Sequence, residues 1–198
     1  MKFNKIKKIS KKGGFTLIEI MVSSTIFIVV MTISMGSIYS VIEGNRKSQS
    51  MRSIMDNLNI TLESMTRVMR FGYLYHCDSD SITNPVVLTL PSDCPDMVNG
   101  ASSISLYSSS GVNYIYKLEN NRITRYVGGS ATPSYLTSSD VTIESLKFYV
   151  YGSAKYSSLN FAQPMIVIII KGYVGSKPTI KSTFAIQTAV SQRLFDTQ

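Results

Sequence analysis

The chain has little of what enzyme active sites are usually built from. Histidine occurs once in 198 residues, as His76, next to a cysteine. A general base needs partners that position it, and one histidine with few neighbours of that kind is a poor candidate. Neither a GxSxG sequence nor a Walker-type phosphate loop is present. We therefore interpret His76 as an exposed polar residue in a loop, and the composition argues against an enzyme.

Cysteine is almost as scarce, with Cys77 and Cys94 as the two examples. They form no CxxC unit and have no second pair, which disfavours a zinc site. If this region lies in an oxidising compartment, they can form one intramolecular disulfide. Closing a loop of about 18 residues would stabilise the fold by roughly 3 kcal/mol in the chain-entropy model. Two reduced thiols or half of a metal site are the alternatives.

Metal ligands of other kinds are also few. Asp78 and Asp80 form a DxD sequence between the cysteines, where calcium is conceivable. The glycine and the distal glutamate of an EF-type loop are missing there. The sequence therefore predicts no metal and no cofactor.

Acidic residues are absent from the first 14 positions, and this explains most of the net charge of +8. Without those positions the chain has 14 basic and 12 acidic side chains, a balance of +2. The twelve tyrosines mostly fall in strand-like runs and are read as half-buried sheet residues. There is thus little electrostatic argument for nucleic acid binding. The positive charge of the first 14 positions comes from six lysines: Lys2, Lys5, Lys7, Lys8, Lys11 and Lys12.

A long apolar run follows the lysines. Residues 15–42 contain one charged side chain, Glu19, and are long enough to cross a membrane as a helix. The preceding lysines predict that the N-terminus stays in the cytoplasm and that the rest of the chain lies outside. The run is about twice as long as the core of a secretory signal and has no small-x-small site at its far end. We expect an anchor that is not cut on its outer side.

The helical pattern continues beyond the membrane segment. Arg52 with Asp56 and Glu63 with Arg67 are possible i,i+4 pairs, each contributing about 0.3 kcal/mol. Neither proline nor glycine occurs in residues 45–71. The pattern predicts one helix over about residues 15–70, roughly 80 Å long. Its outer half has an amphipathic face with apolar side chains three and four residues apart: Met51, Ile54, Met55, Leu58, Leu62, Met65, Val68 and Met69.

The chain after Gly72 is typical of β-structure. Residues 112–118 and 122–127 flank a short polar turn and predict a hairpin. Apolar alternation changes phase near Ser145, which predicts a bulge. Residues 165–170 are apolar without alternation and predict a strand covered on both faces. With a last strand around Ile180, Phe184, Ile186 and Val190, the sequence predicts an α+β fold in which a mainly antiparallel sheet of about four to six strands packs on the long helix.

The junction between leader and helix combines three features. Gly13 and Gly14 leave the backbone unobstructed, so a protease could bind it extended, although glycines here could also simply end the helix. Glu19 is a carboxylate in an apolar segment, which costs about 2.5 to 3.5 kcal/mol at a membrane centre and less near an end. Cleavage before Phe15 would create a cationic amine four residues away that could pair with Glu19. A protonated or snorkelling Glu19 is the alternative.

The sequence GGFTLIEIMVSSTIFIVVM, residues 13–31, resembles the N-terminal segment shared by type IV prepilins and type II secretion pseudopilins. The resemblance implies that a membrane-embedded prepilin peptidase cuts between Gly14 and Phe15 and N-methylates Phe15. Glu19 would correspond to the glutamate that guides a subunit into the filament. Many major pilins have a proline where this chain has Gly36, so helix melting there is less assured, because glycine weakens a helix by about 1 kcal/mol and proline by about 3.

The resemblance also implies a type IV pilin-like fold and the partners of such a subunit. The expected parts are a cleaved leader (1–14), a transmembrane half of the helix (15–42), an amphipathic half (43–71) and an extracytoplasmic domain (72–198). The hairpin and later strands are similar to J-type minor pseudopilins and W-type minor pilins, which sit at filament tips. A major pilin or a non-polymerising single-pass adhesin is the alternative. The implied partners are other pilin subunits, prepilin peptidase, the inner-membrane assembly platform and, before assembly, membrane lipid.

Overall fold

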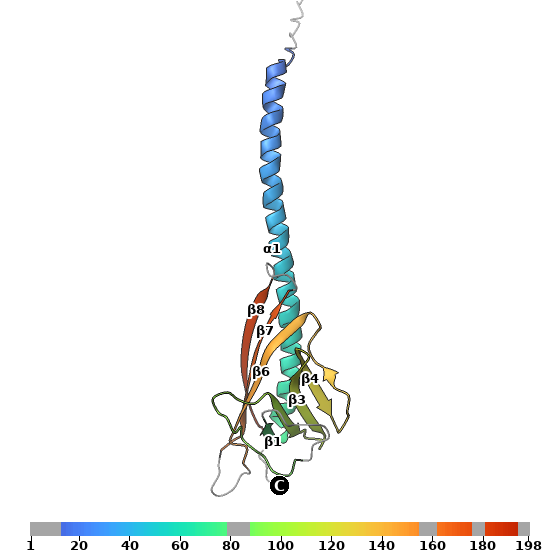
Figure 1. Cartoon of the computed structure of the whole chain (residues 1–198), viewed down its shortest axis with the longest axis vertical. Helices are drawn as coiled ribbons and strands as arrows, with labels where there is room; N and C mark the ends of the chain where they lie inside the picture. The colour runs from blue at the N-terminus through green and yellow to red at the C-terminus, as the bar shows by residue number, and fades with distance from the viewer. Residues whose placement is uncertain (1–12, 79–87, 155–161, 176–180, 194–198) are drawn as a thin grey trace, which may run out of the picture. The chain divides into compact units, whose positions relative to one another are not determined.

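The computed structural model describes residues 13–78, 88–154, 162–175 and 181–193 (Figure 1). The chain divides into two compact units, Met1–Arg46 and Lys47–Gln198. In the described residues there is one long helix followed by strands. The elements in chain order are α1 (Leu17–Phe71), β1 (Tyr73–Asp78), β2 (Ser103–Tyr107), β3 (Asn113–Glu119), β4 (Arg122–Val127), β5 (Ser134–Tyr135), β6 (Val141–Tyr151), β7 (Met165–Val174) and β8 (Ser182–Ser191).

The predicted helix is confirmed to within two residues at its start and one at its end. Its last turn is closed by two features. The Tyr75 hydroxyl lies 2.6 Å from the Met69 carbonyl oxygen and 2.7 Å from that of Gly72, so it satisfies carbonyls that have no partner within the helix. A Cβ at Gly72 would lie 2.6 Å from a Leu106 methyl and 2.7 Å from the Tyr107 carbonyl oxygen. Only glycine therefore fits where the chain leaves α1 and enters β1.

The predicted amphipathic face of α1 is also confirmed. Met55 and Val68 are partly buried beside the core, and Leu58, Met65 and Met69 are fully enclosed. The charged side chains between them remain exposed, and of the two expected ion pairs Glu63 with Arg67 is formed, at 2.8 Å. The buried positions of α1 begin only at residue 54 and are Ile54, Leu58, Thr61, Leu62, Met65 and Met69.

The strands form two antiparallel sheets, where the sequence predicted one. The first has the order β1-β2-β3-β4-β5 and the second β6-β7-β8. β5, at the edge of the first sheet, has two residues, and the second sheet begins with β6. The sheets still touch: the backbones of Ala101 and Phe148 exchange two hydrogen bonds of 2.8 Å, and the Ile143 amide donates to the Asn121 carbonyl at 2.8 Å. Figure 1 shows strands of both sheets beside the outer half of α1. Both sheets contribute side chains to one core cluster with this half of the helix.

Two local predictions are confirmed in detail. The hairpin of β3 and β4 turns through Asn120 and Asn121, whose φ angles are 50° and 58°. Two consecutive left-handed residues are the signature of a type I′ turn, which asparagine tolerates better than most residues. The register of β6 on β7 shifts between Ile143 and Ser145, where the sequence predicted a bulge.

Two expectations about the strands were wrong, and two strands were not predicted. β7 is covered on one face only: Ile166, Ile168 and Ile170 are buried, whereas Met165 is 38% exposed and its same-face neighbours are half-buried. The run is apolar on both sides, and its sequence does not say which side faces the core. His76 lies in β1 and not in a loop, and its side chain is partly buried. The strands that were not predicted are β1 and β2.

Two apolar side chains of α1 provide a matched test of this packing. Leu58 is fully buried, whereas Ile60 is 69% exposed. We expect Leu58→Ala to lower the free energy of unfolding by about 2 to 5 kcal/mol, because it leaves a cavity in the core. Ile60→Ala should change it by less than about 0.5 kcal/mol, as surface substitutions usually do. Urea denaturation of both variants measures the difference, and equal losses would contradict the observed face.

Candidate processing and anchoring site

The start of α1 is set by a threonine cap. The Glu19 amide donates to the Thr16 hydroxyl at 3.3 Å, and the Ile20 amide donates to the Thr16 carbonyl at 3.2 Å. Thr16 is thus the N-cap, Leu17 the first helical residue and Glu19 the third. Threonine followed three residues later by glutamate is a capping-box pattern. This signal is present in the sequence, and our interpretation of Glu19 missed it.

The cap places Glu19 in an electrostatically favourable position. A carboxylate in the first turn lies near the free amides at the positive end of the helix dipole, which stabilises the negative charge. The site residues before it are exposed: Phe15 is 79% accessible, and no atom lies within 4 Å of a Cβ built on Gly13 or Gly14. The two glycines and Phe15 therefore precede the helix as accessible, non-helical backbone.

Several hydroxyl groups of the apolar run donate hydrogen bonds to carbonyls of the same helix. Thr25 donates to the Met21 carbonyl, Thr32 to that of Ile28 and Ser34 to that of Val30, each at 2.8 Å. Such back-bonding lets a hydroxyl lie in lipid without an unpaired donor. In the described residues α1 is the one helix long and apolar enough to cross a membrane, and its apolar window lies near the N-terminus with no part buried in protein.

Cys77 and Cys94 are joined by a disulfide, with their Cα atoms 4.8 Å apart. Both are at least 97% buried. Cys77 belongs to β1, and the Val150 amide of β6 donates to the Cys94 sulfur at 3.1 Å. The segment before Cys94 also bonds to β1, because the Cys77 amide donates to the Ser92 carbonyl at 3.0 Å. The disulfide therefore holds the two sheets together at the end of α1.

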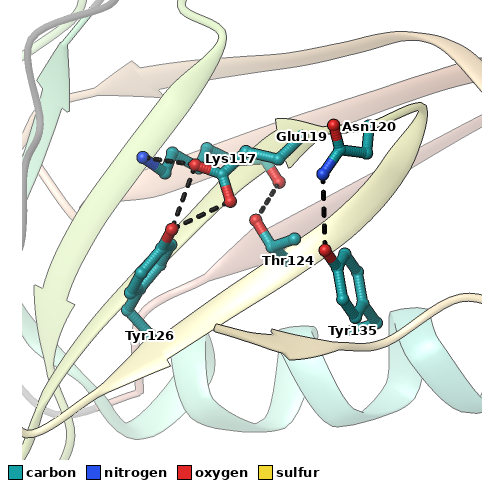
Figure 2. A network of polar contacts seen from close by, with 6 residues as sticks. All are labelled: Lys117, Glu119, Asn120, Thr124, Tyr126 and Tyr135. Carbon is teal, nitrogen blue, oxygen red and sulfur yellow. Dashed lines mark hydrogen bonds and ion pairs between the residues drawn. The ribbon is translucent and has the colours of Figure 1, made fainter. Parts of the chain in front are cut away.

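A polar cluster lies on the β3–β4 hairpin (Figure 2). The Tyr126 hydroxyl donates to the Glu119 carboxylate at 2.9 Å, and the Lys117 ammonium lies 2.7 Å from the same carboxylate. Burial by itself would raise the pKa of Glu119, but the hydrogen bonds from Lys117 and Tyr126 outweigh it and hold that pKa below its usual range. Burial, and then the bond to Glu119, raise the pKa of Tyr126 to about 12.

At neutral pH these shifts keep Glu119 ionised and Tyr126 protonated. An ionised carboxylate and a protonated phenol, each engaged by the other, give no acid or base that titrates near pH 7. Thr124 and Asn120 complete the cluster through bonds to the Lys117 carbonyl and the Tyr135 hydroxyl at 3.0 and 3.4 Å. The arrangement fastens the hairpin, and nothing in it points to catalysis. Over the described ranges, no three acidic, histidine or cysteine side chains gather as a metal site would require.

Comparison with protein-family models finds one match, and it falls on the capped N-terminus. The prokaryotic N-terminal methylation motif matches residues 9–35. The motif covers Gly14, Phe15 and Glu19 and is the leader of type IV pilins. It supports a type IV pilin or pseudopilin precursor that prepilin peptidase processes, that assembles with other pilin subunits and that is anchored by one membrane helix.

The methylation motif spans 27 of the 198 residues, so the outer domain is described by its own structure. Neither a curated protein nor a solved structure shows significant similarity to the chain. One long N-terminal helix packed on antiparallel sheets is an α+β arrangement consistent with a type IV pilin-like fold. The family of the motif consists of structural subunits and is not known for enzymatic activity.

The disulfide gives a prediction about stability. We expect the Cys77→Ser, Cys94→Ser double variant to unfold with about 3 kcal/mol less free energy than the oxidised protein, because its unfolded chain is no longer cross-linked. Urea denaturation with and without a reductant measures this. The reductant should destabilise the unsubstituted protein by a similar amount and leave the double variant unchanged. If the reductant left the urea midpoint of the unsubstituted protein unchanged, the prediction would be contradicted.

The Glu119 cluster gives a prediction about pH. Because the pKa of Glu119 is lower in the folded state, its ionised form stabilises the fold above the unfolded pKa, about 4.3, and this contribution is lost as pH falls through the folded pKa. Glu119→Gln should therefore be less stable than the unsubstituted protein at pH 6, and the difference should shrink toward about pH 2. Thermal unfolding at both pH values measures this difference in stability, and the exposed Glu63→Gln variant is the control. A difference that stays the same at both pH values would contradict the lowered pKa of Glu119.

Proposed function

We propose that the chain is the precursor of a minor, tip or initiating, subunit of a type IV pilus or type II secretion pseudopilus. Prepilin peptidase cuts it between Gly14 and Phe15 and methylates the new amine of Phe15. The observation that carries the proposal is the methylation motif at residues 9–35, which coincides with accessible backbone directly before a capped, apolar helix. The leader and its lysines are then discarded.

The geometry of the cap explains how a peptidase gains access without unwinding the helix. Thr16 is the last residue before α1, so the Gly14–Phe15 peptide bond lies outside the hydrogen-bonded ladder. Glycine at two successive positions removes the side chains that would limit an extended approach. The cut leaves Phe15 and the Thr16 cap in place, and the mature helix keeps its own N-terminal signal.

Assembly is proposed to depend on Glu19. The amine of the mature Phe15 carries a positive charge, and Glu19 of the same or a neighbouring subunit is its natural partner in an apolar bundle, where an unpaired charge is strongly disfavoured. The helix end supplies part of the stabilisation of Glu19 before assembly. The subunit waits as a single-pass inner-membrane protein, with residues 72–198 outside, and passes from lipid to a surface or periplasmic filament.

The minor-subunit assignment comes from the outer domain. The sequence of residues 114–127, which forms the β3–β4 hairpin, together with the later strands, is what resembles J-type pseudopilins and W-type minor pilins. Labelling the subunit in intact filaments distinguishes the alternatives. Signal confined to filament ends supports the proposal, whereas signal along the shaft indicates a major pilin and the absence of filament signal indicates a non-polymerising adhesin.

Processing is tested by mass spectrometry of the N-terminal peptide from cells that possess the peptidase. The expected peptide begins at Phe15 and carries one additional methyl group. Gly14→Val should retain the full leader, because a β-branched side chain now obstructs the site, whereas Gly36→Ala should be cut normally. If the unsubstituted protein kept Met1 in such cells, the proposal would be contradicted.

The role of Glu19 is tested against Glu43, the next acidic residue of α1. Glu19→Ala should be cleaved but should enter sheared filaments at least about tenfold less, since breaking a buried charge pair costs about 3 kcal/mol or more. Glu43→Ala should be cleaved and incorporated normally. Quantitative immunoblots of membrane and filament fractions measure both, and equal incorporation of the two variants would contradict the pairing.

A further inference from the structure

One stretch of α1 belongs neither to the apolar run nor to the buried face of the helix. The apolar run ends at Ile42, and the first buried position of the outer half is Ile54. Residues 43–50 lie between them, and every one of their side chains is exposed. The division between the two compact units falls inside this stretch, after Arg46. We call residues 43–50 the bare segment.

The bare segment is also a weak helix by its own sequence, EGNRKSQS. Glycine lowers the helical equilibrium about fivefold relative to alanine, and asparagine and serine are poor helix formers as well. A helical stretch shorter than about 12 residues is marginal in water unless tertiary packing holds it. The stretch forms no side-chain hydrogen bond or ion pair with any described residue.

Gly44 has no packing role that would explain its presence. No atom lies within 4 Å of a Cβ built on it, so alanine would fit there without a clash. Gly36 is equally free of neighbours, but it lies within the apolar run, where opened backbone amides and carbonyls find no water. The two glycines therefore have the same surroundings in the protein and different surroundings in a membrane. Only Gly44 weakens a segment that water can open.

We infer that α1 opens locally in the bare segment, at Gly44 first, while residues 17–42 and 54–71 remain helical. Local opening concentrates where buried apolar contacts are few and backbone hydrogen bonds face solvent, and the bare segment meets both conditions. The opening leaves the helical residues on either side of the bare segment hydrogen-bonded. It lies eight residues beyond Gly36, and it does not depend on cleavage or on filament assembly.

Hydrogen exchange of the full-length, uncleaved chain in lipid bilayer discs tests the inference. Amides of the bare segment should exchange at least tenfold faster than those of residues 58–69. Gly44→Ala should slow exchange in the bare segment about fivefold, which corresponds to the difference of about 1 kcal/mol between the two residues in a helix. Gly36→Ala is the matched control and should leave the bare segment unchanged.

Limited trypsin digestion provides a second readout, because Arg46 and Lys47 are cleavage sites within the bare segment. Cleavage there requires local unfolding, so its rate should fall about fivefold in Gly44→Ala and stay the same in Gly36→Ala. Exchange in the bare segment as slow as in residues 58–69 would overturn the inference. So would equal effects of the two glycine substitutions. Urea unfolding of the outer domain should be the same in all three proteins, since neither glycine contacts it.

Discussion

The burial of one stripe of α1 is the interaction on which the outer domain depends. Leu58, Met65 and Met69 are fully enclosed, and the apolar faces of both sheets close over this stripe. A sheet with one apolar face needs a second layer, and here a single helix serves two sheets at once. Ile104 and Ile123 reach the core from the first sheet, and the inward residues of β6, β7 and β8 reach it from the second. The outer half of α1 therefore completes a core that both sheets share.

A group of polar contacts lies where α1 ends. The Gln192 side chain donates to the Gly72 carbonyl at 2.9 Å, and the Arg193 amide donates to the Arg70 carbonyl at 2.8 Å. The Tyr75 hydroxyl also donates to the Gly72 carbonyl. Cys77, one half of the disulfide, lies two residues further along β1. Free carbonyls at a helix end are expensive to bury unless something donates to them. The residues just after β8 and the start of β1 both donate to this end, so the last strand is tied to the helix terminus as well as to β7.

What the sequence revealed follows from how each signal is encoded. The helix face and the β3–β4 hairpin were predictable because their patterns are local and repeated over many residues. β2 was not predicted because Ser103 and Ser105, which are buried, resemble turn residues in a sequence. The coverage of β7 was misjudged because an apolar run does not record which neighbours fold onto it. The cap at Thr16 was not predicted although its spacing to Glu19 fits a capping box, because a carboxylate in an apolar run also has an electrostatic interpretation.

The candidate site differs from the domain because its residues are continuous in the sequence. The proposed cleavage site, the cap and the proposed anchor follow one another from Gly13 to the end of the apolar run, so no tertiary contact is needed to assemble them. The outer domain instead brings together residues as distant as Gly72 and Gln192. The bare segment lies in the sequence between the candidate site and the residues of the folded domain. If it opens as we infer, the anchor and the domain fold independently, and substitutions such as Leu58→Ala should weaken the domain while leaving the processing signal before α1 intact.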